Sequence, residues 1–282
     1  MKRKKFILGI LLVAIILLMG GGYAFLYYRW RHFWEPATAE LSYQPIKESS
    51  DTLHVIMIGD SWAEMHQRHD SIMSSLLSSE FPIPVSFKSK GKGGAKSKEI
   101  YYYMFKNRTD GHAFEYCTQD LIETKPDYCI VMAGINDAAS CLGTDFYWNN
   151  YYCIIRLLLD LGIRPVVVEM PMVNIKELYA DKPIYHKLCD ALRAMMTRSP
   201  LYDVNDYSSF LLQRIEESGL KDSLVIVHKE MWNADGFKDE RCLYQPDNIH
   251  LNDYGYTLID SCIVSNIKED YVRRTKSNSI TE

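Results

Sequence analysis

The sequence lacks the patterns that would place it in several common functional classes. Its seven cysteines include no Cys-x-x-Cys pair, which argues against a zinc ribbon and a thioredoxin-like redox motif. The glycine-rich stretch 90–97 does not satisfy the Walker pattern, because Lys90 and Ala95 stand where that pattern requires glycine. Outside residues 1–32, 26 basic side chains face 36 acidic ones, a net charge of −10, which disfavours nonspecific binding of nucleic acid. We expect no cofactor and no nucleic-acid partner.

Charged residues are also absent from one long run near the amino terminus. Phe6 to Tyr28 is a stretch of 23 residues without Asp, Glu, Lys or Arg. As a helix it would span about 34 Å, enough to cross a bilayer core of about 30 Å. Basic residues at 2–5 precede it, so the positive-inside rule predicts a single-pass membrane protein with a cytoplasmic amino terminus and an extracytoplasmic remainder. A signal peptide cleaved after the small residues 20–22 is the competing interpretation, but the length of the run favours an uncleaved anchor.

The rest of the chain divides into a linker, one domain and a tail. Residues 1–32 hold the basic tip and the anchor, 33–52 predict a linker, 53–272 a single domain, and 273–282 a polar tail that frays. Runs such as 127–132 are apolar throughout, which is typical of a parallel sheet covered on both faces. We expect an α/β domain with strands at 53–59, 84–90, 127–134, 164–170 and 223–228, and helices at 64–79, 96–106, 113–124, 147–161, 181–197, 206–218 and 253–270.

Three short polar blocks carry the chemistry of the chain. They are Gly59-Asp60-Ser61 at the end of the first strand, Gly134-Ile135-Asn136-Asp137 after the third, and Asp247-Asn248-Ile249-His250 before the last helix. A serine hydroxyl needs a base to act as a nucleophile, and His250 could accept its proton and pass it to a leaving alcohol. Asp247 could orient the imidazole and stabilise its charged form. Each block alone is typical of a turn or a helix cap, but together they predict a serine hydrolase.

In their order and spacing these blocks resemble the SGNH (GDSL-like) hydrolase family over roughly residues 53–270. The resemblance implies a three-layer α/β/α sandwich with a central, mostly parallel sheet. It implies a catalytic triad of Ser61, Asp247 and His250. It also implies an oxyanion hole made by the backbone N–H groups of Ser61 and Gly94 and by the side-chain amide of Asn136. Residues 89–97 resemble the family's Asn-x-Gly-x-x-Gly-x-x-Ser/Thr loop, except that Ser89 stands in place of its asparagine.

Signals for the substrate are weaker than those for the reaction. Five lysines surround the predicted oxyanion loop, at 88, 90, 92, 96 and 98. They could form a solvated loop, or Lys92 and Lys96 could bind substrate together with Trp62 beside the nucleophile. With the anchor, the resemblance favours an extracytoplasmic esterase that removes O-acyl groups, O-acetyl in particular, from a cell-envelope or secreted glycan. An O-acyltransferase using the same Ser61 acyl-enzyme, a lipase and a thioesterase are the alternatives.

A pair of histidines beside the nucleophile allows two interpretations. His66 and His69 are three residues apart and could share a helix face with Glu64, which is a spacing that metal sites use. Their apolar-poor surroundings favour a solvated surface instead. We therefore expect no metal site here.

Overall fold

The structure is a computed structural model that describes residues 2–34, 43–47, 51–105, 114–171, 173, 175, 179–180, 182–232 and 243–281. The chain forms two compact units, Met1–Pro36 and Ala37–Glu282. The first unit contains one helix, α1 (Lys2–Trp34). Within it, Lys4–Tyr28 has a mean hydropathy of 2.5 and is long and apolar enough to cross a membrane.

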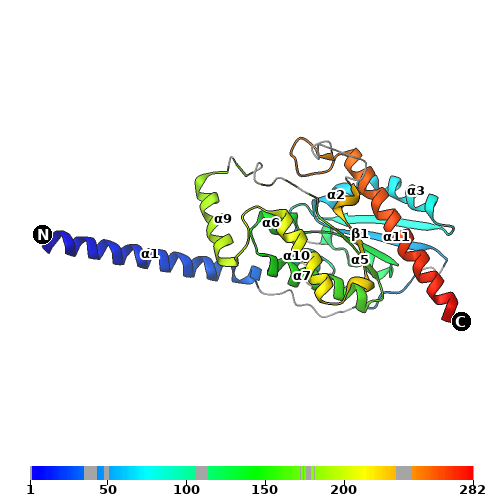
Figure 1. The fold of residues 1–282 in the computed structure, drawn as a ribbon, viewed down its shortest axis with the longest axis horizontal. Helices are drawn as coiled ribbons and strands as arrows, with labels where there is room; N and C mark the ends of the chain where they lie inside the picture. The colour runs from blue at the N-terminus through cyan, green and yellow to red at the C-terminus, as the bar shows by residue number, and fades with distance from the viewer. Residues whose placement is uncertain are drawn as a thin grey trace. The chain divides into compact units, whose positions relative to one another are not determined.

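A sheet of five parallel strands forms the centre of the second unit (Figure 1). Its order is β2-β1-β3-β4-β5, and the direction in which strands are added changes between β1 and β3. In an open α/β sheet this switch point is where ligands bind, at the carboxyl ends of the strands. All five predicted strands are confirmed: β1 (Leu53–Gly59), β2 (Val85–Gly91), β3 (Tyr128–Met132), β4 (Arg164–Val168) and β5 (Val225–Val227).

Two groups of helices flank the sheet, so the predicted α/β/α sandwich is confirmed. In the first group α3 (Asp70–Glu80) and α11 (Asp253–Thr281) contact each other and lie side by side in Figure 1. In the second, α7 (Thr144–Asp160) contacts both α4 (Ser97–Tyr103) and α10 (Val204–Glu217). The remaining elements are α2 (Ser61–His66), α5 (Gln119–Glu123), α6 (Ile135–Ala139), α9 (Ile184–Thr197) and the 3₁₀ turns η1 (Gln67–His69), η3 (Phe114–Tyr116), η4 (Lys221–Ser223) and η5 (Lys229–Trp232).

Some predicted boundaries differ from the observed ones. α11 continues to Thr281, where the sequence predicted a frayed tail. The helix predicted at 113–124 is two short elements, η3 and α5, and its first residue lies outside the described residues. α6 was not predicted, because five residues are too few to show a helical period. Of the predicted linker, residues 35–42 and 48–50 lie outside the described part of the chain.

Candidate active site

Ser61 lies at the carboxyl edge of the sheet, as the first residue of α2 directly after β1. The turn between them depends on Gly59, because a Cβ there would lie 2.1 Å from the carbonyl oxygen of Met132. Asp60 caps the helix by accepting the backbone N–H of Trp62 at 3.0 Å. As the first helical residue, Ser61 has a backbone N–H with no partner within its own helix. The turn therefore presents both the hydroxyl and the N–H of Ser61 at the edge of the sheet.

A chain of hydrogen bonds joins Ser61, His250 and Asp247. The Nε2 atom of His250 is 3.0 Å from Oγ of Ser61, and its Nδ1 atom is 2.6 Å from Oδ2 of Asp247. Because a carboxylate can only accept, Nδ1 carries the hydrogen and Nε2 is left to accept the serine hydroxyl. The structure therefore brings together the three side chains that the motifs predict as a triad.

The turn that presents His250 is held by Asp247 itself. The Oδ1 atom of Asp247 accepts the backbone N–H groups of Ile249 and His250, each at 2.9 Å. Partial burial alone would raise the pKa of Asp247, but the hydrogen bonds from the His250 ring and from both N–H groups outweigh it and hold this pKa below its usual value. Asp247 is therefore ionised at neutral pH and able to stabilise an imidazolium.

Asn136 and the glycine loop, which carry the other two predicted oxyanion groups, lie beside the turn that holds Ser61. Asn136 follows β3, and its side-chain amide donates to the Asp60 carboxylate at 3.2 Å and to the carbonyl of Ala95 at 3.1 Å. Ala95 directly follows Gly94, which has a φ of +76° that favours glycine. A Cβ on the adjacent Gly93 would lie 4.0 Å from Cβ of Ser61, so this loop borders the nucleophile. An oxyanion would replace one of the present acceptors of the Asn136 amide.

Two buried carboxylates that the sequence did not single out hold this arrangement. Asp60 is buried against Asn136, and burial raises its pKa to about 7. Asp137 accepts the backbone N–H of Ser97 at 2.9 Å and the hydroxyl of the same residue at 2.6 Å. Burial raises the pKa of Asp137 to about 6, although these two hydrogen bonds oppose the rise. Asp60 precedes Ser61 and Asp137 follows Asn136, so their position next to a predicted site residue was the signal by which the sequence could have identified them.

Lysines near the glycine loop have partners within the chain. Lys96 is 3.4 Å from a carboxylate oxygen of Glu99 and 3.5 Å from the carbonyl oxygen of Gly94. The ammonium of Lys92 donates to the hydroxyl of Tyr103 at 2.9 Å and lies 5.0 Å from the centre of the Tyr116 ring. Of the two lysines predicted to bind substrate, Lys92 is the one whose ammonium lies against an aromatic ring beside the glycine loop.

A small apolar pocket opens next to the nucleophile turn. Its lining includes Asp60, Trp62, Ile135 and Met170, from the ends of β1, β3 and β4. Trp62 is only 3% exposed, so its ring forms part of this wall and is not an open stacking platform. The pocket gives the site a compact apolar recess at the topological switch point.

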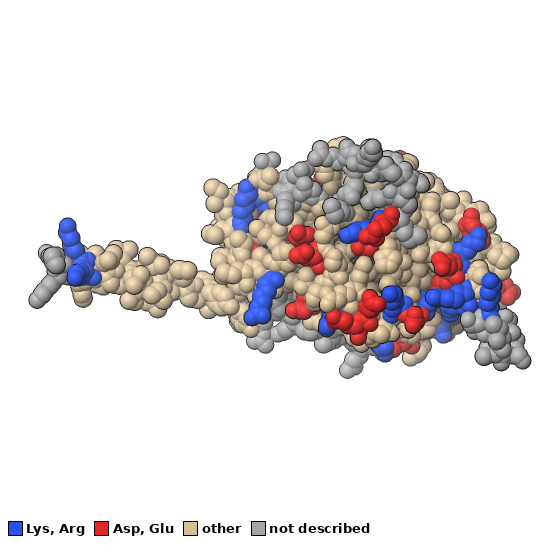
Figure 2. Space-filling model, viewed as in Figure 1, with Lys and Arg blue, Asp and Glu red and all other residues tan. Residues whose placement is uncertain are grey.

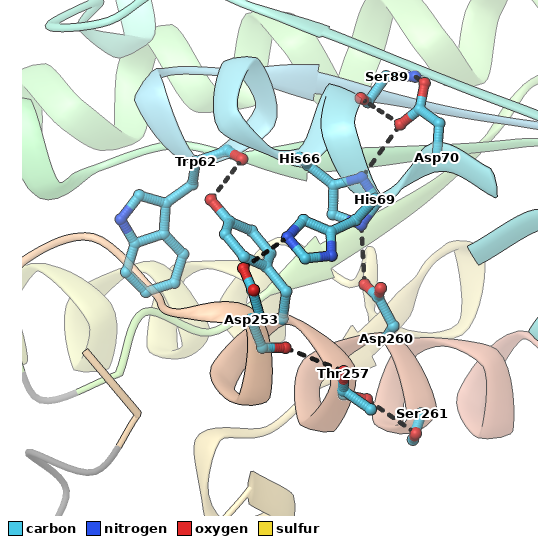
Figure 3. Close-up of polar contacts among 10 residues, drawn as sticks. Trp62, His66, His69, Asp70, Ser89, Asp253, Thr257, Asp260 and Ser261 are labelled. Atoms are coloured by element: carbon cyan, nitrogen blue, oxygen red, sulfur yellow. Dashed lines mark hydrogen bonds and ion pairs between the residues drawn. The ribbon is translucent and has the colours of Figure 1, made fainter. Parts of the chain in front are cut away.

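Behind the nucleophile, a buried histidine joins α2 to α11 (Figure 3). The Nε2 atom of His66 is 2.9 Å from Oδ1 of Asp260, and its Nδ1 atom is 3.2 Å from Oδ1 of Asp70. Asp70 in turn accepts the hydroxyl of Ser89 at 2.6 Å, which extends the network to β2. His66 and Asp260 are fully buried, so the expectation of a solvated His66 is wrong.

The second histidine of the pair is also buried rather than solvated. His69 stacks on the ring of Tyr256 with centroids 4.8 Å apart, and its Nε2 atom is 3.4 Å from the exposed carboxylate of Asp253. Tyr256 donates its hydroxyl to the carbonyl oxygen of Trp62 at 3.0 Å. These contacts tie the first turn of α2 to the first turn of α11, the helix that follows His250.

One set of described side chains has the spacing of metal ligands and shares Glu169 with the lining of the apolar pocket. Glu169, His228 and Glu230 each offer a ligand atom within 4.8 Å of the others. The ammonium of Lys229 is 3.5 Å from a carboxylate oxygen of Glu169, and the backbone N–H of the same lysine donates to that carboxylate. Glu169 therefore already has a cationic partner, because it forms an ion pair with Lys229.

Comparison with known proteins establishes the fold. No protein-family model and no curated protein matches the sequence. A GDSL-like lipase from Bacteroides thetaiotaomicron is similar in structure, with 13% identity, a TM-score of 0.52, and 80% of this chain and 92% of that one covered. An acetylxylan esterase from Geobacillus stearothermophilus is similar with 16% identity and a TM-score of 0.51, and the match covers 78% of this chain and 94% of that one. A lipase/acylhydrolase from Enterococcus faecalis is similar with 14% identity and a TM-score of 0.50, and the match covers 77% of this chain and 96% of that one. The chain therefore has the SGNH-hydrolase fold that its sequence motifs predict.

Proposed function

We propose that this chain is an SGNH-type serine esterase that hydrolyses O-acyl esters. The observation that carries the proposal is the hydrogen-bonded chain Asp247–His250–Ser61 at the switch point of a sheet with this fold. Nucleophile, base and orienting carboxylate are the arrangement that acyl transfer through a serine requires. Esterases and acylhydrolases among the similar structures support the same reaction class.

The proposed reaction has two acyl-transfer steps. In the first, Oγ of Ser61 bonds to the ester carbon while its proton moves to Nε2 of His250, and the carbonyl oxygen becomes an oxyanion. Collapse of this intermediate breaks the ester C–O bond, and the leaving alcohol takes the proton from His250. In the second step a water attacks the acyl carbon while its proton moves to Nε2 of His250. The bond between Oγ of Ser61 and the acyl carbon then breaks, Oγ takes the proton from His250, and free Ser61 and a carboxylic acid result. Asp247 stabilises the imidazolium present in both steps.

The substrate that we favour is a small acyl ester, O-acetyl in particular, on a cell-envelope or secreted glycan. Acetylxylan esterases among the similar structures support a short acyl group. Lys92, whose ammonium lies against the half-buried ring of Tyr116, offers a cation that an acidic glycan could contact. A lipase, a thioesterase and an O-acyltransferase remain the competing functions of the same fold.

Product analysis on a substrate panel tests this function. We expect the purified protein to release acetate from acetylated glycans and from aryl acetates, and to act more slowly on long-chain aryl esters if acetyl is the preferred acyl group. Adding an acceptor sugar alcohol separates hydrolase from transferase, since a transferase would form a new glycan ester instead of free acetate. Absence of turnover on every ester in the panel would contradict the proposal.

Replacing Asn136 with alanine tests the oxyanion hole. We expect kcat to fall by roughly 10²–10³-fold with little change in KM, because the amide would bind charge that exists only in the transition state. Steady-state kinetics on an aryl acetate provides both constants. A change confined to KM would instead assign the amide to ground-state binding.

We propose that α1 is an uncleaved membrane anchor with its basic end in the cytoplasm, which places Ser61 outside. The length and apolarity of Lys4–Tyr28 and the basic residues before it support this topology. Protease added to sealed spheroplasts should therefore digest the catalytic domain while leaving cytoplasmic markers intact. Complete protection of the domain, or a soluble mature form beginning after Gly22, would contradict the anchored topology.

A further inference from the structure

The helix α9 presents its apolar side to solvent. Ile184 is 84% exposed, Leu188 57% and Met195 65%, and Ala191 is exposed between them. These positions are spaced by four, three and four residues, so they form one continuous stripe along the helix. Tyr185, 72% exposed, lies at the start of the same helix. A surface helix normally turns such a stripe towards the core, so its exposure here requires an explanation.

The side of α9 that faces the domain carries a buried carboxylate as well as Ala194. Asp190 is buried and accepts both the Lys182 ammonium, at 2.6 Å, and the hydroxyl of Tyr202. Arg193 donates to the carbonyl of Ser140 at 2.6 Å, at the end of α6. These buried polar contacts fix which side faces inward, because rotating α9 would strip Asp190 of its partners and leave a buried charge. The outward stripe is therefore a stable feature of the fold.

The charges on α9 suit an anionic partner. Its one acidic residue is the buried Asp190, whereas Lys187 and the following Arg198 are exposed and basic. This contrasts with the excess of acidic side chains in the rest of the domain. In Figure 2 the surface over α9 is mostly tan with some blue, whereas red and blue are mixed over other parts of the same face. An apolar stripe flanked by basic residues is the pattern of a helix that lies in a lipid interface.

The length of the linker keeps such an interface within reach. Residues 35–52 separate the end of α1 from β1. Even fully extended, these residues span at most about 65 Å. If α1 is anchored in a bilayer, the domain thus stays close to a lipid surface at a high effective concentration, which adds to the affinity that α9 itself has for lipid.

We propose that α9 docks on the surface of an anionic lipid bilayer, with Ile184, Leu188 and Met195 inserted below the headgroups and Lys187 and Arg198 among them. The proposal rests on the proposed anchor for its location, but not on esterase activity. Because Arg193 fastens α9 to the end of α6, the helix that carries Asn136, docking would hold the active site close to the membrane surface. A substrate attached to or lying against the cell envelope would then be within reach.

A cut-and-release experiment on the full chain tests this docking. A protease site is inserted between residues 36 and 43, the protein is reconstituted in vesicles of phosphatidylcholine and phosphatidylglycerol, and the linker is cut. We expect the released domain to sediment with these vesicles, and to do so less in high salt or with phosphatidylcholine alone. The double substitution Ile184→Ser with Leu188→Ser should lower the partition coefficient about tenfold or more, because both side chains contribute to apolar burial.

A matched control removes two exposed aliphatic side chains elsewhere. Ile72 on α3 and Val272 on α11 are 43% and 39% exposed, and changing both to serine should leave vesicle binding unchanged. Unfolding midpoints check that all variants are folded. Release of the wild-type domain as a monomer, or equal binding by both double variants, would overturn the proposal. So would release as a dimer that the α9 variant dissociates, which would make the stripe a self-association surface. If the proposed anchor were wrong, the uncut protein would fail to enter the vesicles, and this result is distinguishable from a failure of α9 to dock.

Discussion

Replacing Ser61 with alanine should abolish ester hydrolysis, with kcat/KM lowered by about 10⁴–10⁶-fold. The hydroxyl is the group that would form the acyl-enzyme, and no other hydroxyl is hydrogen-bonded to His250 among the described residues. Stability should change by less than about 0.5 kcal/mol, because a half-buried Oγ is removed and no cavity of consequence is left. Initial rates on an aryl acetate and an unfolding curve measure both quantities.

Two comparisons sharpen this result. His250→Ala should be nearly as severe, because members of a triad act as one unit, and Asp247→Asn should cost no more than His250→Ala. Ser86 is a matched control, since its hydroxyl is also hydrogen-bonded to a histidine, Nδ1 of His54 at 2.8 Å, but lies exposed in β2. Ser86→Ala should retain full activity. Turnover close to wild type in Ser61→Ala would refute the mechanism.

The parts of the fold that the sequence predicted are those that leave a local pattern. Continuous apolar runs predicted β1, β3, β4 and β5, because strands buried on both faces tolerate few polar residues. β2 differs, since it includes Ser86, Lys88 and Lys90 and is only partly buried. Ser61 and His250 lie 189 positions apart, yet each sits in a short block with a recognisable spacing, so the sequence predicted their meeting. A helix as short as α6 has too few residues to show a helical period, so the sequence did not predict it.

Features that depend on tertiary packing could not be predicted. The sequence predicted a solvated His66, because its partner Asp260 is 194 positions away and both are buried only when α2 and α11 pack. The period of α9 predicted a helix but not which side faces the core, and the inward-facing Asp190 reverses the usual choice. Asp60 likewise looked like part of a turn, whereas it is a buried carboxylate behind Asn136.

Replacing Asp260 with asparagine should destabilise the protein by about 3–5 kcal/mol at pH 6, because it leaves a buried imidazolium without one of its carboxylates. Burial alone lowers the pKa of His66, but the carboxylates of Asp260 and Asp70 accept its ring hydrogens and raise this pKa to about 9. The substitution conserves shape, so the loss reports on charge rather than on a cavity. Chemical denaturation across a pH series measures it.

The pH dependence distinguishes an ion pair from simple packing. The pKa of His66 in the folded protein, about 9, lies above the ordinary value of 6.5, so the stabilisation is complete below about pH 6.5 and is lost as pH rises through 9. The difference in unfolding free energy between wild type and Asp260→Asn should therefore shrink over that range, by the part of the pKa rise that Asp260 rather than Asp70 causes. Asp253→Asn is the matched control, because Asp253 faces His69 from the same helix but is 86% exposed, and it should cost less than about 1 kcal/mol. A difference that stays constant from pH 6 to about pH 9.5 would show that His66 is buried as a neutral ring, since only a charged imidazole couples the α2–α11 contact to pH.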